Sequence, residues 1–286
     1  MIPPSLSVIL LGLTSSIVWG VSDFLGGLAS RRAPLFGVLV GAQLVGLAIA
    51  APVAVARGEG QLVSTDFAWS AVSGLLGALG IGFLYRGLAV GRMGVVAPVT
   101  GVLVAVIPVM AGIILDGVPS ALVVAGIILA IGSVAVVARV PGVDTERSSG
   151  LWWGIGAGLT LGVFTVTFSR VTNGLVFGPL AVMKIVEGLA LLTAIVLGRQ
   201  AWRVPRSLWP MLLAVGALDM GATAAYLAAT QAGPLAIAGV LSALYPVMTV
   251  LLAATVLRER VTRVHALGIL AAAAAIALIA GGSAGS

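Results

Sequence analysis

The sequence predicts an all-α integral membrane protein whose ten transmembrane helices form two inverted five-helix repeats. The first indication is composition, because 60% of the 286 residues are hydrophobic and 8% are charged, whereas a soluble domain is roughly 45–50% apolar and about 25% charged. The second is that the apolar residues gather in runs near the roughly 20 residues that a spanning helix needs. The third is an internal repeat that divides the chain in two. Because the charges are too few to cover a water-facing surface, we expect the chain to lie in lipid.

Apolar runs bounded by charges, proline or glycine define the ten expected spans. The first run lacks a basic leading segment and is too long for the core of a signal peptide, so we expect it to persist as a span. Pro119 and Ser120 place a proline and a capping hydroxyl at the start of the fifth span, and Thr262 can cap the tenth. The spans are predicted at residues 5–29, 35–56, 68–90, 95–115, 119–138, 151–170, 178–198, 208–231, 235–257 and 264–280.

The connections between these runs are short, and the longest, residues 139–150, lies at the midpoint of the chain. We therefore predict a first five-helix repeat at 1–140, a linker loop at 141–150 and a second repeat at 151–286. No connection is long enough to hold a soluble domain.

The two halves share sequence. Residues 101–110 (GVLVAVIPVM) match residues 239–248 (GVLSALYPVM) at seven of ten positions. Each half has five spans, an odd number, so the second half must enter the membrane inverted relative to the first. Inverted repeats recur in secondary transporters, where related halves expose a central site to either side in turn. The alternative is that duplication only enlarges a helix bundle.

Two prolines occupy matching places in the repeat, Pro108 in the fourth span and Pro246 in the ninth. A proline inside a span frees a backbone carbonyl and bends the helix. These residues are hinge candidates beside a cavity between the halves.

Ionisable residues inside spans are the main candidates for function, because each costs at least about 2.5–3.5 kcal/mol to insert. Asp23 and Arg86 are predicted to lie at one depth and can pair if their helices adjoin. Lys184 and Glu187 stand three apart and can bridge within one helix. Asp219 lies near the depth of Glu187 and has no partner in its own helix.

These charges are not duplicated, although the scaffold is. In the repeat alignment, Asp23 corresponds to Thr165 and Lys184 to Ala42. Glu187 corresponds to Val45 and Asp219 to Gly80. A residue needed only by the shared fold would more often occur twice, although a purely structural salt bridge remains the alternative for each pair. We hypothesise that Asp219 or Glu187 carries a coupling proton, since intramembrane carboxyl groups serve as proton relays.

Four aromatic residues within spans, Trp19, Tyr85, Tyr226 and Tyr245, are candidates to line a pocket for an aromatic or cationic substrate. The alternative for each is packing in the helix bundle. Tyr245 is the strongest candidate because it adjoins Pro246.

Several functional classes are disfavoured. The chain has no Cys and a single His, His265, so a thiol nucleophile, an iron–sulfur cluster and a Cys/His zinc site are excluded, and we expect neither cofactor nor metal. No phosphate-binding loop or paired catalytic carboxylates are present, so we expect no enzyme and no ATP-driven pump. The basic residues lie between apolar runs rather than on one face, which argues against nucleic acid as a partner.

Residues 19–24 (WGVSDF), together with residues 257–262 (LRERVT) followed by residues 268–270 (GIL), resemble the EamA branch of the drug/metabolite transporter superfamily. The resemblance covers the whole chain as two five-span modules. The first half departs from the family pattern at residues 116–119 (DGVP), where a Glu is usual. The resemblance implies a ten-helix carrier for a small metabolite or drug, often an exporter, with its pocket between the halves.

We therefore predict a secondary active transporter in the cell membrane, with lipid and a small organic solute as partners, protons as a candidate coupling ion, and a monomeric or homodimeric state. A membrane-embedded enzyme, a lipid-handling protein and a passive channel are the alternatives. Orientation stays open. Eleven arginines lie on one side and two on the side of the termini, which by the positive-inside rule puts the termini outside, whereas the resemblance puts them in the cytoplasm.

Overall fold

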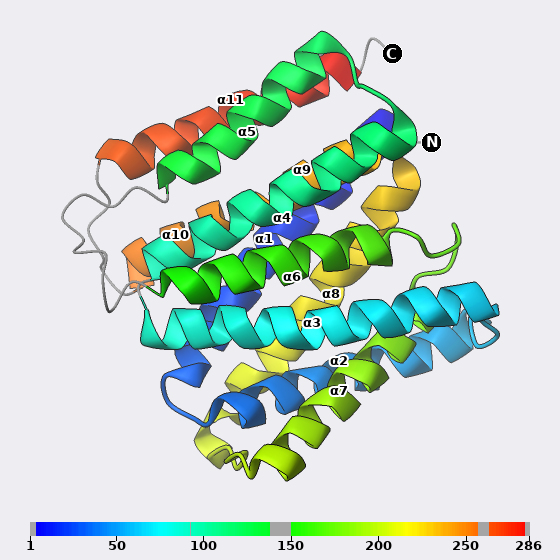
Figure 1. The fold of residues 1–286 in the computed structure, drawn as a ribbon, viewed down its shortest axis with the longest axis vertical. Coiled ribbons are helices and arrows are strands. Elements are labelled where there is room, and N and C mark those ends of the chain that lie inside the picture. Colours follow the sequence, from blue (N-terminus) through cyan, green and yellow to red (C-terminus); the bar gives the residue numbers. More distant parts are fainter. Residues whose placement is uncertain (1–3, 92, 138–149, 257–262, 284–286) are drawn as a thin grey trace.

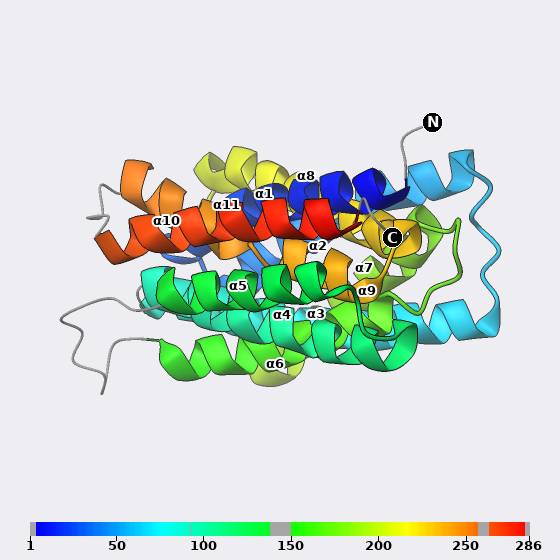
Figure 2. The same cartoon turned by 90° about the horizontal axis from the view of Figure 1, so that it is seen from above.

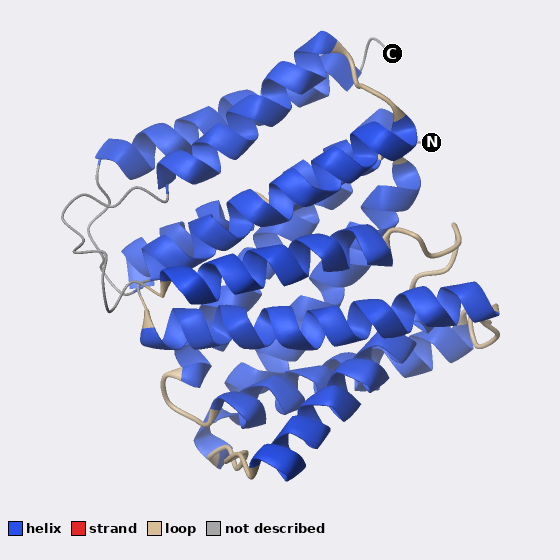
Figure 3. Cartoon of the chain, in the orientation of Figure 1, coloured by secondary structure: helices blue, strands red, loops and turns tan. Residues whose placement is uncertain are grey.

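The computed structural model describes residues 4–91, 93–137, 150–256 and 263–283, and every regular element within them is helical (Figure 3). The predicted linker lies outside the described residues except for Gly150. The elements are α1 Pro4–Ser30, α2 Leu35–Ala56, α3 Ser64–Val90, α4 Met93–Asp116, α5 Ala121–Val137, α6 Leu151–Phe168, α7 Phe177–Gly198, the short 3-10 helix η1 Arg206–Leu208, α8 Trp209–Ala232, α9 Leu235–Ser242, α10 Tyr245–Val256 and α11 Arg263–Ser283.

Eight helical segments of the described chain are long and apolar enough to cross a membrane: α1 to α4, α6 to α8, and Leu235–Val256, which joins α9 and α10. The apolar stretches of α5 and α11 are shorter, Ala121–Ser133 and Leu270–Ile279. The chain is therefore a multi-pass membrane protein with helices at all ten predicted places, and the count of ten crossings stays a prediction.

The ninth predicted span is broken between α9 and α10, directly before Pro246. Proline has no N–H to continue the helical ladder and its ring crowds the carbonyl four residues earlier. At the break, the Leu244 amide instead donates to the Leu241 carbonyl, three residues back, at 3.3 Å. Pro108 lies within the uninterrupted helix α4. The matched prolines therefore differ, and of the two only Pro246 coincides with a break.

Helices of the two halves pack against each other in a reciprocal pattern. Helix α1 of the first half lies along α8 of the second, and α6 of the second lies along α3 of the first (Figure 1). Glycines allow the close approaches: a Cβ on Gly12 of α1 would lie 3.0 Å from the Leu241 Cβ of α9, and a Cβ on Gly158 of α6 would lie 2.6 Å from the Leu103 Cβ of α4. Small residues of this kind let membrane helices pack where lipid removes the hydrophobic drive.

Helices α5 and α11 pair with each other at one edge of the bundle (Figures 1 and 2). Helix α1 begins at the same end of the bundle at which α11 ends (Figure 1). The remaining helices surround a cavity near the middle of the molecule.

Candidate functional site

A cavity of about 50 Å³ lies where α1 to α4 meet α6 to α8 and α10. Its walls are largely apolar, with polar groups contributed by both halves. Sites for drug-sized ligands measure about 300–1,000 Å³, so this space is smaller than such a site.

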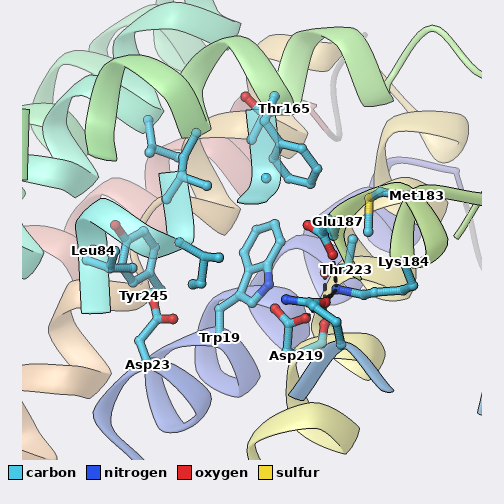
Figure 4. A pocket seen from close by; sticks show the side chains of 16 residues that line it. Trp19, Asp23, Leu84, Thr165, Met183, Lys184, Glu187, Asp219, Thr223 and Tyr245 are labelled. Carbon is cyan, nitrogen blue, oxygen red and sulfur yellow. Dashed lines mark hydrogen bonds and ion pairs between the residues drawn. The ribbon is translucent and has the colours of Figure 1, made fainter. Parts of the chain in front are cut away.

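Lys184 organises the polar wall of this cavity (Figure 4). Its ammonium Nζ lies 2.6 Å from Asp219 Oδ2 and 2.9 Å from Glu187 Oε2, and it donates to Gln43 Oε1 at 2.7 Å. These three contacts use the three N–H donors of the ammonium, and the Lys184 side chain is 2% exposed. The intrahelical bridge expected from the spacing of Lys184 and Glu187 forms, and Asp219 joins it from α8.

Gln43 is a site residue that the sequence reasoning missed. It is the only polar side chain in the apolar helix α2, and it is 3% exposed. A buried amide needs hydrogen-bond partners, so a lone glutamine in a span was a usable signal.

Asp23 lies at another part of the same cavity, with Trp19 between it and the Lys184 cluster in the view of Figure 4. Its side chain is buried, and no ion pair or hydrogen bond to it is found among the described residues. The cavity wall thus holds one ammonium and three carboxyl groups, an excess of two negative charges when all four are ionised.

The expected pair of Asp23 and Arg86 is absent, and that expectation was wrong. Helices α1 and α3 do adjoin, but the residues of α3 that line the cavity with Asp23 are Gly77, Ile81 and Leu84. Arg86 follows two residues later, about 200° further round the helix, and its side chain is exposed. Spacing along the two spans does not reveal the direction in which the Arg86 side chain points.

Two glycines make room for the charged cluster. A Cβ on Gly77 of α3 would collide with Glu187 Oε1, and a Cβ on Gly46 of α2 would lie 3.2 Å from Lys184 Cε. In the other half Gly216, the repeat equivalent of Gly77, would place a Cβ 2.6 Å from Val45 Cβ. Val45 is the repeat equivalent of Glu187. The same close approach therefore accommodates valine in one half and glutamate in the other, so packing alone does not require the carboxylate.

The aromatic candidates divide into two groups. Trp19 and Tyr245 line the cavity. Tyr226 lies behind Trp19, with ring centroids 5.5 Å apart, and its hydroxyl donates to the Thr165 carbonyl at 2.8 Å. Tyr85 is 1% exposed and packs against Gly26 within the core. Tyr85 and Tyr226 therefore support the bundle and do not border the cavity.

A second polar cluster ties the halves together at the end of the bundle where α1 begins. Glu59, between α2 and α3, accepts hydrogen bonds through Oε2 from the amides of Val176, Phe177 and Gly178 at 2.9, 2.6 and 2.9 Å. These amides open α7, so the carboxylate satisfies unpaired donors at a helix N-terminus. Its Oε1 lies 2.6 Å from Arg57 Nε. Burial alone would raise the pKa of the Glu59 carboxyl, but the hydrogen bonds outweigh burial and hold that pKa below its ordinary value.

Two further carboxylates of the first half, Asp66 and Asp116, also accept hydrogen bonds from the second half. Asp66 Oδ1 accepts from the amide and hydroxyl of Thr172 at 2.9 and 3.0 Å. Asp116 Oδ2 accepts from the Leu235 amide at 2.9 Å, at the start of α9. Sequence reasoning assigned these charges only to span ends, because the chain does not show which helix N-terminus lies across the interface. Within the described chain, no three His, Cys, Asp or Glu side chains gather as metal ligands would.

Comparisons with known proteins agree with this arrangement. Residues 6–139 and 148–281 each match the model of the EamA-like transporter family. Among 29 matching chains of solved structures, one described as "Crystal structure of protein" is 21% identical, with a TM-score of 0.73 over 95% of this chain and 96% of that chain. At this identity the likeness shows the fold alone. No curated protein matches the chain.

Proposed function

Since this chain belongs to the EamA-like transporter family, we propose that it is a secondary active transporter of a small organic solute, with export as the favoured direction. The solute occupies the cavity between the two repeats, which open it alternately to the two sides of the membrane. The observation that carries the proposal is the Lys184 cluster, in which one buried ammonium contacts two carboxylates beside a small cavity at the junction of the halves.

Inverted repeats are part of the proposal, and matching contacts in the two halves support them. Phe36-Gly37 lies in the first turn of α2 and Phe177-Gly178 opens α7, one residue apart in the repeat alignment. A Cβ on Gly37 would collide with the Trp202 carbonyl of the second half, and a Cβ on Gly178 would collide with the Glu59 carbonyl of the first. A loop of each half thus packs against the start of a helix in the other half. Such reciprocal contacts are expected of two halves related by a two-fold axis in the membrane plane.

Protons are the proposed coupling ion, with Glu187 and Asp219 as carriers. Both carboxylates contact the single ammonium of Lys184, so one can take up a proton while the other keeps its ion pair. The excess of negative charge and the indole of Trp19 suit a solute that carries a positive charge. Exchange of such a solute for a proton keeps the charge of the site nearly constant, which limits the cost of burying it.

The alternatives fit the cavity less well. A passive channel needs a continuous aqueous path across the membrane, whereas the space at the junction of the halves measures only about 50 Å³. An embedded enzyme needs a reacting constellation, and a lipid-handling protein would need an apolar site at the junction of the halves. The wall of the central cavity instead carries one ammonium in contact with two carboxylates.

Proteoliposomes test the proposal. Purified protein is assayed for uptake of amines, quaternary cations, amino acids and sugars, with and without a proton gradient. We expect saturable, gradient-driven flux of one class of cation, and loss of the gradient dependence in Glu187→Gln and Asp219→Asn. Glu146→Gln, in the predicted linker, controls for loss of a carboxylate and should transport normally. Gradient-driven uptake by both site variants would refute the coupling role, and an unsaturable voltage-dependent current would favour a channel.

Orientation follows from the arginines. We infer that the end carrying Arg31, Arg199 and Arg206 faces the cytoplasm, because basic residues are retained there. Alkaline phosphatase activity of a fusion at Ser286 supports termini outside, and fluorescence of a green fluorescent protein fusion at the same residue contradicts it.

A further inference from the structure

A second and larger cavity, of about 780 Å³, lies between α2, α3, α6 and α7. Residues 77, 81 and 84 of α3 face the central cavity, whereas residues 75, 79, 82 and 86 line this one, so the two lie on different faces of the helix. Its wall is mainly aliphatic and aromatic, and the volume is that of a ligand site. Representative lining residues are Leu39, Leu75, Leu79, Phe83, Trp153 and Leu191.

The cavity has the depth of one membrane leaflet. Along α3 it extends from Leu75 to Arg86, a rise of about 16 Å at about 1.5 Å per residue. The hydrocarbon core of a bilayer is about 30 Å thick, so the cavity covers about half of it. Leu75 and Leu79 are 52% and 56% exposed, which places its open side towards the surrounding lipid.

Arg86 brings a positive charge to this apolar space. Its side chain is exposed, and in the part of the chain that the structure describes it has no ion pair or hydrogen bond. It stands four residues before the end of α3, and Trp153 stands two residues after the start of α6. Tryptophan at a span end marks the headgroup level. A guanidinium at that level has the geometry to bind a phosphate through two parallel N–H bonds.

We propose that this cavity binds one anionic phospholipid from the leaflet at the arginine-rich end, with an acyl chain along α3 and the phosphate at Arg86. Charge complementarity selects the occupant: a chain alone would leave the guanidinium without a counter-charge, and a soluble phosphate would leave the apolar wall unfilled. The inference rests on membrane insertion and is independent of the proposed transport activity.

Native mass spectrometry of the detergent-purified full chain tests the proposal by titration with phosphatidylglycerol or phosphatidylcholine. We expect one tightly bound phosphatidylglycerol, with about tenfold weaker binding in Arg86→Gln, as the loss of a charge-assisted hydrogen-bonded pair implies. Arg86→Lys keeps the charge and should retain most of the affinity. Ala194→Phe fills the cavity and should weaken binding of the lipid while Arg86 remains. Arg206→Gln, an exposed arginine at the same end outside the cavity, is the matched control.

Three results would overturn the proposal: equal binding of the two lipids, equal effects of Arg86→Gln and Arg206→Gln, or displacement of the lipid by glycerol phosphate, which carries the phosphate without acyl chains. Gel filtration of each variant confirms that a loss of binding is not a loss of folding. Arg86→Lys provides a second test. If this variant folds but no longer prefers phosphatidylglycerol to phosphatidylcholine, that result would also count against the proposal.

Discussion

Lys184 carries the one positive charge among the described residues that line the central cavity. Its ammonium contacts Glu187, Asp219 and Gln43 at the same time, so it neutralises part of the negative charge of the site. Removing one member of a buried charge cluster leaves the others without compensation, which costs about 3–5 kcal/mol. The cluster therefore holds α2, α7 and α8 together. We expect the proposed cationic solute to compete with Lys184 for the carboxylates.

Gly77 sets the position of one of those carboxylates. In Gly77→Ala the new methyl group takes the place of Glu187 Oε1, so the carboxylate must change its position in the cavity wall. We expect gradient-driven uptake in proteoliposomes to fall about tenfold or more, because small displacements in a site cost large factors in rate. The unfolding temperature should change little, since the displaced atoms end a flexible side chain.

Gly82→Ala is the matched control in the same helix. Its Cβ would lie 3.9 Å from Leu39 Cδ1, an ordinary van der Waals distance, and uptake should equal that of the unmodified protein. Unchanged uptake in Gly77→Ala would mean that the position of Glu187 is unimportant.

At the scale of elements, the N-terminus of α7 depends on a carboxylate from the other half. Glu59 accepts hydrogen bonds from the amides of Val176, Phe177 and Gly178 at the start of α7, and it forms an ion pair with Arg57. Together with Asp66 and Asp116 it closes one end of the bundle across the interface. In the proposed alternating-access cycle these contacts loosen when that end opens, so they contribute to the energy difference between the two access states.

Glu59→Gln should lower the free energy of unfolding at pH 7 by about 1–2 kcal/mol, as loss of a charged helix cap does. The folded-state pKa of Glu59 lies below its ordinary value, so its contribution is complete above the unfolded pKa of about 4.3 and disappears as the pH falls through the folded pKa. Thermal unfolding at a series of pH values checks this. The difference between the two proteins should shrink in acid, and equal stabilities at pH 7 would contradict the expectation.

The break between α9 and α10 is the place where we expect the second half to bend during transport. Pro246→Ala restores the missing N–H and favours a continuous helix, so we expect the maximal transport rate to fall severalfold if residues 243–244 bend during the cycle. Pro108→Ala changes the matching proline in the unbroken α4 and serves as the control. Initial rates of uptake at saturating solute compare the two, and an equal or larger loss in Pro108→Ala would remove the hinge role from Pro246.

At the scale of the molecule, the sequence predicted where helices lie better than how they face one another. The second span was predicted at residues 35–56 and α2 is Leu35–Ala56, because a long apolar run between polar segments has one physical interpretation in lipid. The bridge between Lys184 and Glu187 followed from spacing within one helix.

What could not be predicted depends on how each helix is rotated about its axis and on which helices are neighbours. Asp219 meets Lys184 across helices, whereas Arg86 turns away from Asp23. Composition and periodicity fix depth in the membrane but leave rotation and neighbours to packing between helices. The same reason explains why Glu59 was assigned only to a span end.

The central claim is that the two repeats expose the cavity to one side of the membrane at a time. Thr223 lines the cavity and is 2% exposed, and the chain contains no cysteine, so Thr223→Cys introduces a single reporter. Its reaction with a membrane-impermeant thiol reagent is measured from each side of sealed vesicles, with opposite proton gradients. The account predicts labelling from one side under each gradient and a change of side when the gradient is reversed. Simultaneous labelling from both sides, or no labelling in a variant that still transports, would contradict it.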